Sequence, residues 1–235
     1  MRTQFIVIGM PDNQCYISKN KEILDIINSN THFSGGKRHY ELLRPFLPVD
    51  AVWIDIKVPL ADVFDEYEYH RKIVVFASGD PLFSGFASTI LKRMPEAEVT
   101  IMPSFNSLQM LSHELKMSYE DMLMVPLTGR PWHELDRALI ENRMKIGILT
   151  DHVHTPAAIA MRLLKYGFTQ YKMYIGEHLG NPEKQRVSRS LALSEVEEHL
   201  IESPNCVILQ RMYNDTTYRP LGIPDKMFEF LDGRE

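Results

Sequence analysis

Apolar runs rich in β-branched residues recur along the first half of the chain and predict strands. Residues 52–56 alternate apolar with other side chains, which is typical of a peripheral strand. The continuous run at 73–77 indicates a strand buried on both faces. The full set of predicted strands in this half is 5–8, 31–34, 52–56, 73–77 and 99–102. Helical patterns separate them, so we expect βαβ crossovers and a mainly parallel sheet.

Helix start signals lie between the apolar runs. Ser18 is expected to cap a helix that continues to residue 28. Thr155, followed by Pro156 at the first helical position, predicts another helix that ends at Tyr166. Further helices are expected at 132–141 and after a capping box at 194–197. Strands are expected in the second half at 122–127, 145–149, 171–175 and 206–209.

The alternation of strands and helices restarts after Leu115, which indicates an α/β chain with two domains. We place them at 1–114 and 115–213. Residues 214–235 are rich in turn-forming residues and charges, and we expect a tail or linker there.

The junction after the run at 73–77 is the strongest pointer to a ligand. The chain continues Ser78-Gly79-Asp80-Pro81-Leu82-Phe83, where Asp80 is expected to cap a helix whose first residue is Pro81. Open α/β folds bind their ligands at the carboxyl ends of sheet strands. We therefore expect the 78–83 loop to lie at the functional site.

Composition narrows the class of partner. The chain has 235 residues and a formal net charge of −5, which disfavours a general affinity for nucleic acid or anionic membranes. Its two cysteines, Cys15 and Cys206, lie far apart and suggest no disulfide framework. No run reaches membrane-spanning length or forms a signal sequence. We expect a cytoplasmic protein that contacts neither nucleic acid nor membrane.

Several common chemical motifs are missing from the sequence, among them the G-x-G-x-x-G fingerprint and the Walker A motif. The segment Asp151-His152-Val153-His154 offers alternate histidines that can face one metal ion on an extended loop. A metal-dependent hydrolase is therefore an outside alternative. Because no further ligands lie nearby in the sequence, surface or capping roles are favoured and no metal is expected.

A basic cluster follows a glycine pair at the end of the predicted strand at 31–34. It consists of Lys37, Arg38 and His39, and Arg130 offers a further cation from the second half. Guanidinium and ammonium groups at strand ends suit a ligand with carboxylates. The alternative is that these are ordinary solvated charges.

Taken together, the loops resemble the tetrapyrrole methylase family, and within it the C5-methyltransferases that act on precorrin-6Y or cobalt-precorrin-7 in cobalamin (vitamin B12) biosynthesis. The resemblance extends to about Tyr213. It is carried, in family order, by the segments at 35–39, 77–85, 103–109, 127–130, 149–160 and 176–180. One such segment alone is weak, whereas six in order are specific.

The resemblance implies two α/β domains with an active-site cleft between them, S-adenosylmethionine as cofactor, a polycarboxylate tetrapyrrole as substrate, and a homodimer. The implied substrate contacts are Lys37, Arg38 and Arg130, and the candidates for a general base are His39 and Glu177. The implied cofactor contacts are Pro11, Gly79, Asp80, Phe83, Asn106, Ser107, Thr150 and Ile175.

One loop departs from the family pattern. The first strand is followed by Gly9-Met10-Pro11-Asp12-Asn13, where the family has the more glycine-rich G-x-G-P-G. A weaker affinity for the cofactor and a role of Asp12 toward the substrate are both open.

The tail at 221–228 resembles the connector of fused enzymes, in which a C15-methyltransferase and decarboxylase domain follows. The chain is then either a fragment of such an enzyme, which we favour, or a separate protein. Two further functions stay open: methylation of another tetrapyrrole position, and a non-catalytic module that binds a ligand in the same cleft.

Overall fold

The computed structural model describes residues 2–215, which form two compact units. The first contains the chain up to Asn106 together with Gly180–Glu183, and the second contains Ser107–Leu179 and the chain from Lys184 on. This division falls before the helix α6 (Ser107–Leu115), whereas the sequence prediction placed it after that helix. The helix belongs to the second unit because its buried Leu108 packs on Gly147, a residue of that unit's sheet.

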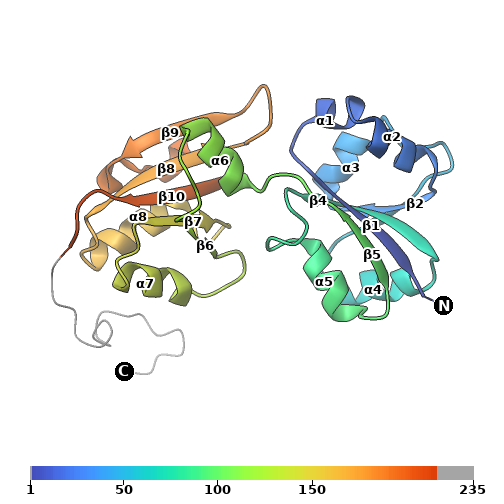
Figure 1. The fold of residues 1–235 in the computed structure, drawn as a ribbon, viewed down its shortest axis with the longest axis horizontal. Coiled ribbons are helices and arrows are strands. Elements are labelled where there is room, and N and C mark those ends of the chain that lie inside the picture. The colour runs from blue at the N-terminus through green and yellow to red at the C-terminus, as the bar shows by residue number, and fades with distance from the viewer. Residues whose placement is uncertain (1, 216–235) are drawn as a thin grey trace. The chain divides into compact units, whose positions relative to one another are not determined.

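The first unit has a fully parallel sheet, as expected (Figure 1). Its strand order is β3-β2-β4-β1-β5. The strands are β1 (Gln4–Met10), β2 (His32–Gly35), β3 (Val52–Asp55), β4 (Lys72–Ser78) and β5 (Glu98–Met102). The central strands β4 and β1 are continuous apolar runs because both of their faces are buried.

Helices cover both faces of this sheet. Successive residues of β4 point to opposite faces, so Val75 packs in a core with Val63 and Ile90, while Val74 packs in another with Ile17 and Ile23. The helices are α1 (Gln14–Ser18), α2 (Lys21–Asn28), α3 (Lys37–Leu43), α4 (Leu60–Glu68) and α5 (Phe86–Arg93).

Ser18 does not begin a helix, contrary to the sequence prediction. It is the last residue of α1, and α2 begins after Asn20, whose side chain accepts a hydrogen bond from the Ile23 amide. An asparagine caps as well as a serine does, and the break at Lys19 between the two short helices has no strong sequence signal.

The second unit has a mixed sheet, in contrast to the parallel sheet of the first. Its order is β6-β7-β10-β8-β9, and the last strand along the chain, β10, runs antiparallel to both neighbours. The strands are β6 (Leu123–Pro126), β7 (Lys145–Leu149), β8 (Tyr171–Glu177), β9 (Arg186–Leu191) and β10 (Asn205–Arg211). The sequence prediction missed β9 because this edge strand is largely polar and exposed.

The helices of the second unit are α6, α7 (His133–Ile140) and α8 (Pro156–Lys165). As predicted, Thr155 caps α8 and Pro156 is its first residue. The prediction of a helix after the capping box at 194–197 is wrong, because only two short 3₁₀ turns, Leu193–Glu195 and Glu198–Leu200, form there.

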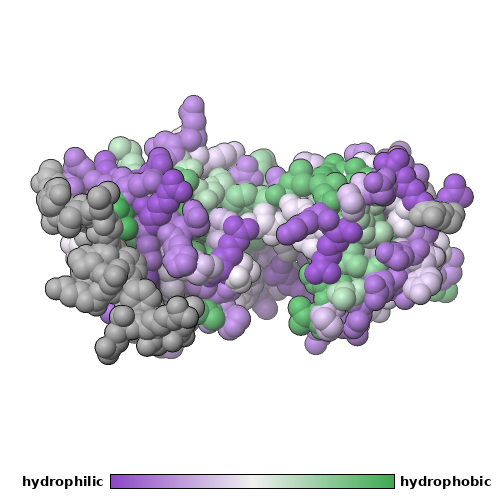
Figure 2. All heavy atoms as spheres, turned by 90° about the horizontal axis from the view of Figure 1, so that it is seen from below, coloured by the Kyte–Doolittle hydropathy of each residue, from purple (hydrophilic) through white to green (hydrophobic). Residues whose placement is uncertain are grey.

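Polar and apolar residues are mixed over both units on the face shown in Figure 2. Among residues 2–215, no helix combines the length and the apolar composition needed to cross a bilayer. The connector-like segment at 221–228 lies outside the described residues.

Candidate active site

The loop after β4 is longer than predicted and does not start a helix at Pro81. The Asp80 Oδ1 atom accepts a hydrogen bond from the Leu82 amide at 2.9 Å, so Asp80 closes a turn. The helix α5 starts at Phe86, after Gly85. Residues 79–85 are therefore loop, which leaves the Oδ2 atom of Asp80 without a partner among residues 2–215.

Three loops of the first unit meet at Gly79. Its amide donates to the carbonyl of Met10, the last residue of β1, at 3.1 Å, and its carbonyl accepts from the Ser104 amide at 3.3 Å and the Ser104 hydroxyl at 3.0 Å. Its φ of +61° lies in the left-handed region that glycine adopts without strain. The ends of β1, β4 and β5 are thus joined through one residue.

The chain crosses itself where Gly9, near the end of β1, lies against Gly79, after β4. This crossing is too tight for side chains. A Cβ atom on Gly9 would lie 1.9 Å from the Gly79 carbonyl oxygen, and one on Gly79 would lie 3.0 Å from the Asn106 Cα atom. Asn106 itself is buried. The structure therefore brings Gly79 and Asn106 into contact and places Pro11 and Asp80 one residue from the crossing, at one edge of the first sheet.

The basic cluster forms the first turn of α3, at the same sheet edge. The Arg38 Nη2 atom donates to the hydroxyl of Ser78, the last residue of β4, at 2.9 Å. The His39 Nε2 atom lies 3.1 Å from the same hydroxyl. Burial and the charge of Arg38 lower the pKa of His39 to about 4, and the Asp12 carboxylate opposes that shift in part.

Lys37 and Arg130 are exposed, and the structure gives neither side chain a hydrogen-bond or ion-pair partner within residues 2–215. Lys37 belongs to the first unit and Arg130 to the second. Arg130 follows Gly129, whose amide donates to the Asp151 Oδ2 atom at 2.9 Å. Its backbone is thereby held by the loop after β7.

Asp151 organises that loop. Burial raises the pKa of its carboxyl group, but hydrogen bonds from the amides of Gly129, His154 and Val153 and from the His154 ring outweigh this, so its pKa is lowered. Its oxygens accept hydrogen bonds from backbone amides of the loops, which agrees with the capping role favoured from sequence. Among residues 2–215 no group of three or more His, Cys, Asp or Glu side chains is arranged to hold a metal ion.

Glu177, a candidate base from sequence, is held by hydrogen bonds within the second unit. Its side chain is buried, and its two oxygens accept hydrogen bonds from Arg186 at 2.7 Å each. The Glu202 amide donates to the same carboxylate at 2.7 Å. Three donors therefore hold both oxygens of this carboxylate in place.

The remaining predicted cofactor residues have different environments. Phe83 is half-buried in the loop after β4, and Ser107 begins α6. The Thr150 hydroxyl donates to Asn205 at the start of β10 at 2.6 Å. The Ile175 side chain is fully buried in the core of the second unit, so only its backbone could meet a ligand.

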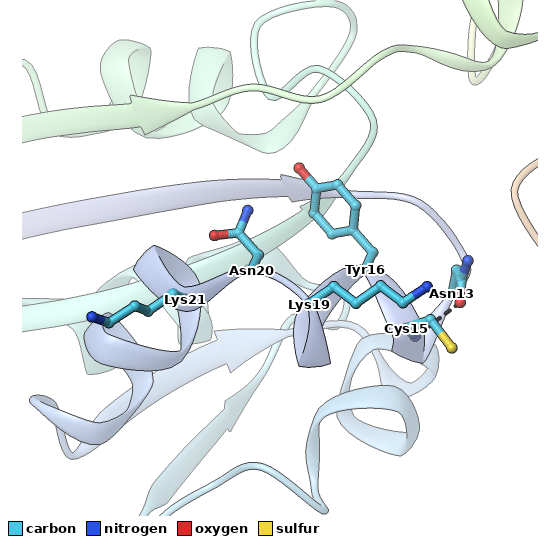
Figure 3. A pocket seen from close by; sticks show the side chains of 6 residues that line it. All are labelled: Asn13, Cys15, Tyr16, Lys19, Asn20 and Lys21. Carbon is cyan, nitrogen blue, oxygen red and sulfur yellow. Dashed lines mark hydrogen bonds between the residues drawn. The ribbon is translucent and has the colours of Figure 1, made fainter.

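A separate hollow of about 450 Å³ lies beside α1 and contains none of the predicted site residues. In Figure 3 the Lys19 side chain extends toward Asn13, whereas Lys21 points away from both. Its lining residues are Asn13, Cys15, Tyr16, Lys19, Asn20 and Lys21. Because its charged groups do not converge, it lacks the character of a ligand site.

Comparison with known proteins connects this geometry to a family. Residues 20–194 match the family model of tetrapyrrole (corrin/porphyrin) methylases. A decarboxylating precorrin-6Y C(5,15)-methyltransferase of Sinorhizobium is 30% identical over 161 residues, which are 67% of this chain and 38% of that enzyme. The chain thus spans well under half of that relative's length.

Two further relatives are similar over more of their own length. The cobalt-precorrin-7 C(5)-methyltransferase of Salmonella typhimurium is 28% identical over 165 residues, 70% of this chain and 79% of that enzyme. A uroporphyrin-III C-methyltransferase of Thermus thermophilus, solved with S-adenosylhomocysteine, is 18% identical and superposes with a TM-score of 0.65 over 89% of this chain and 98% of its own. The prediction of an α/β chain of this type is confirmed, and the chain belongs to the tetrapyrrole methylase family.

Proposed function

We propose that this chain is an S-adenosylmethionine-dependent C-methyltransferase that acts at C5 of a precorrin or cobalt-precorrin in cobalamin biosynthesis. The observation that carries the proposal is Arg38, an exposed guanidinium fixed beside the interlocked loops at Gly79. Support also comes from the names of the Sinorhizobium and Salmonella relatives, which both include the C5 position.

The residues at the Gly79 crossing suit a cofactor of this kind. S-adenosylmethionine, when bound, supplies a methyl group already activated on a positively charged sulfur. We propose cofactor contacts from the first unit at Pro11, Gly79, Asp80, Phe83 and Asn106. The unpartnered Asp80 Oδ2 atom offers a negative charge to a cation, and Asp80 directly follows the tightly packed Gly79.

From the second unit we propose Ser107, Thr150 and Ile175 as further cofactor contacts. The Thr150 hydroxyl accepts as well as donates, so a lone pair of its oxygen is available while it donates to Asn205. Ile175 would act only through its backbone.

Lys37, Arg38 and Arg130 are proposed to bind the acetate and propionate groups of the tetrapyrrole. Lys37 and Arg38 lie in the first turn of a helix, where the helix dipole disfavours cations. Such an unfavourable placement of cations, at a sheet edge that carries other proposed site residues, is typical of residues kept for function rather than for stability.

His39, a candidate base from sequence, is poorly suited to take up a proton near neutral pH. His39 is neutral there because its pKa is about 4, and its Nε2 atom already pairs with Ser78. We propose that the chain contributes by positioning the nucleophilic carbon and the methyl donor, and not by proton transfer.

Calorimetry with S-adenosylmethionine, followed by a methyl-transfer assay with cobalt-precorrin-7 and its metal-free counterpart, tests the proposal. We expect binding and transfer of one methyl group to C5, located by NMR of the product. Transfer to another carbon would support the alternative of a different methylation position. Cofactor binding without transfer would support the non-catalytic module.

We further propose that the protein is a cytoplasmic homodimer, as the family resemblance implies. Size-exclusion chromatography with light scattering tests the dimer. A fused domain acting at C15 stays a prediction, and the sequence of the gene beyond codon 235 tests it.

A further inference from the structure

We propose that Ser78 is a positioning residue that aims the Arg38 guanidinium at a substrate carboxylate; this inference rests on the proposed function. Ser78 ends β4, and α3 follows β2, the neighbour of β4 in the sheet. Because parallel strands end at the same edge, the Ser78 hydroxyl comes within hydrogen-bond distance of both Arg38 and His39.

The hydroxyl can serve both neighbours at once. It accepts from the Arg38 Nη2 atom and still has its own proton, which we assign to the lone pair of the His39 Nε2 atom. Accepting a hydrogen bond from the Arg38 cation makes the Ser78 hydroxyl a stronger donor toward His39. With a lone pair on its Nε2 atom, His39 also presents no N–H group to the positively charged guanidinium. His39 then carries its proton on Nδ1, an atom that is buried and has no partner within residues 2–215.

This contact leaves Arg38 ready for a ligand. Its Nε and Nη1 groups have no partner among the described residues, so they can receive a carboxylate while Nη2 stays on Ser78. An exposed arginine otherwise loses side-chain freedom when it binds, and fixing it beforehand reduces that loss. The His39 ring, itself mostly buried, holds the serine hydroxyl from the other side.

A purely structural role for Ser78 makes a different prediction. If the hydroxyl only tied α3 to β4, its loss would lower stability without changing the affinity for substrate. A positioning role changes substrate affinity specifically, and it does so only while Arg38 is present. The two roles are therefore separated by a double-mutant cycle.

The experiment compares Ser78→Ala, Ser78→Thr, Arg38→Ala and the Ser78→Ala/Arg38→Ala double variant in the methyl-transfer assay with cobalt-precorrin-7. We expect Ser78→Ala to raise the KM for the tetrapyrrole roughly 3- to 10-fold, the loss from one side chain that must be ordered on binding. The Kd of S-adenosylmethionine should not change. Ser78→Thr keeps the hydroxyl, so its KM for the tetrapyrrole should stay close to that of the unaltered protein. In the Arg38→Ala background the serine change should add less than a factor of two.

The matched control is Ser29→Ala, which removes a hydroxyl that donates to the Asp25 carbonyl at the end of α2. It should leave the KM unchanged. An unchanged KM in Ser78→Ala, or equal effects of that change with and without Arg38, would overturn the proposal.

A readout without substrate separates this inference from the proposed function. In ¹⁵N-histidine-labelled protein at pH 7, we expect the signals of a His39 ring protonated on Nδ1, and a shift of the Nε2 signal in Ser78→Ala. An unchanged chemical shift of the His39 Nε2 signal in Ser78→Ala would overturn the inference even if the enzyme methylates its substrate. Absence of any methyl transfer by the unaltered protein would count against the proposed function, while the NMR result would still test the serine contact.

Discussion

The carbonyl oxygen of Gly79 occupies the place where any side chain on Gly9 would begin, at 1.9 Å from an added Cβ atom. Gly9 is the second-last residue of β1 and Gly79 is the first residue after the neighbouring strand β4, in a register that pairs Gly9 with Ala77 and Met10 with Ser78. The loops after these strands cross without side chains between them, and the proposed cofactor contacts Pro11, Asp80 and Asn106 of the first unit lie beside that crossing.

Gly9→Ala should damage both stability and cofactor binding. The obstacle is backbone, which cannot rotate away, so we expect a loss of about 2–3 kcal/mol in the free energy of unfolding, as for an overpacked core. Urea denaturation measures this loss, and calorimetry should show weaker binding of S-adenosylmethionine. The control is Gly36→Ala, where an added Cβ atom meets its nearest neighbour only at 3.8 Å. Equal stability of the two variants would contradict the tight crossing.

Arg130→Ala should weaken substrate binding and spare the cofactor. The side chain is exposed and has no partner within residues 2–215, so its removal breaks no internal contact. We expect the KM for the tetrapyrrole to rise about 5- to 10-fold, roughly 1 kcal/mol, with an unchanged Kd for S-adenosylmethionine. Arg137→Ala is the control, because that exposed arginine already pairs with Glu141. A KM equal to that of the control would remove Arg130 from the proposed substrate contacts.

His39 should make stability depend on pH below neutrality. Its pKa is about 4 in the folded protein against about 6.5 in the unfolded chain, so the unfolded chain binds the extra proton first. Stability due to this group is complete above pH 6.5 and falls as the pH is lowered toward 4. Unfolding of the native protein and of His39→Gln at several pH values measures the effect.

The His39→Gln curve should be flatter between pH 6.5 and 4, with Arg38 and Asp12 as the charged neighbours in both proteins. Parallel curves would mean that His39 ionises normally. NMR titration of the His39 ring, which should show no protonation between pH 5.5 and 8, checks the same point directly.

Glu177→Gln should lower stability and leave catalysis intact. The change removes the charge from a buried carboxylate that Arg186 and the Glu202 amide hold, and the half-exposed Arg186 can turn to water. We therefore expect a loss of about 2 kcal/mol, below the usual 3–5 kcal/mol for a broken buried pair. Glu202→Gln, at an exposed carboxylate, is the control. A large fall in kcat of folded Glu177→Gln protein would restore Glu177 as a candidate base.

The strands of the first sheet are predictable from local sequence, because a continuous β-branched run such as that of β4 is stable only when buried on both faces. The start of α8 is predictable too, since Thr155 and Pro156 act within one helical turn. The order of the loop segments identified the family, which the family model confirms.

Other features depend on contacts between residues that are distant in sequence, so local patterns do not predict them. Asp80 has the signals of a helix cap, but the crossing at Gly79 and the turn to Leu82 delay α5 to Phe86. The polar strand β9 forms because β8 offers it an edge. No local pattern shows that Arg186 lies beside Glu177, or that the parallel register brings α3 to the Ser78 hydroxyl. Local patterns decide which segments become strands and helices, whereas pairing between distant segments decides which side chains meet.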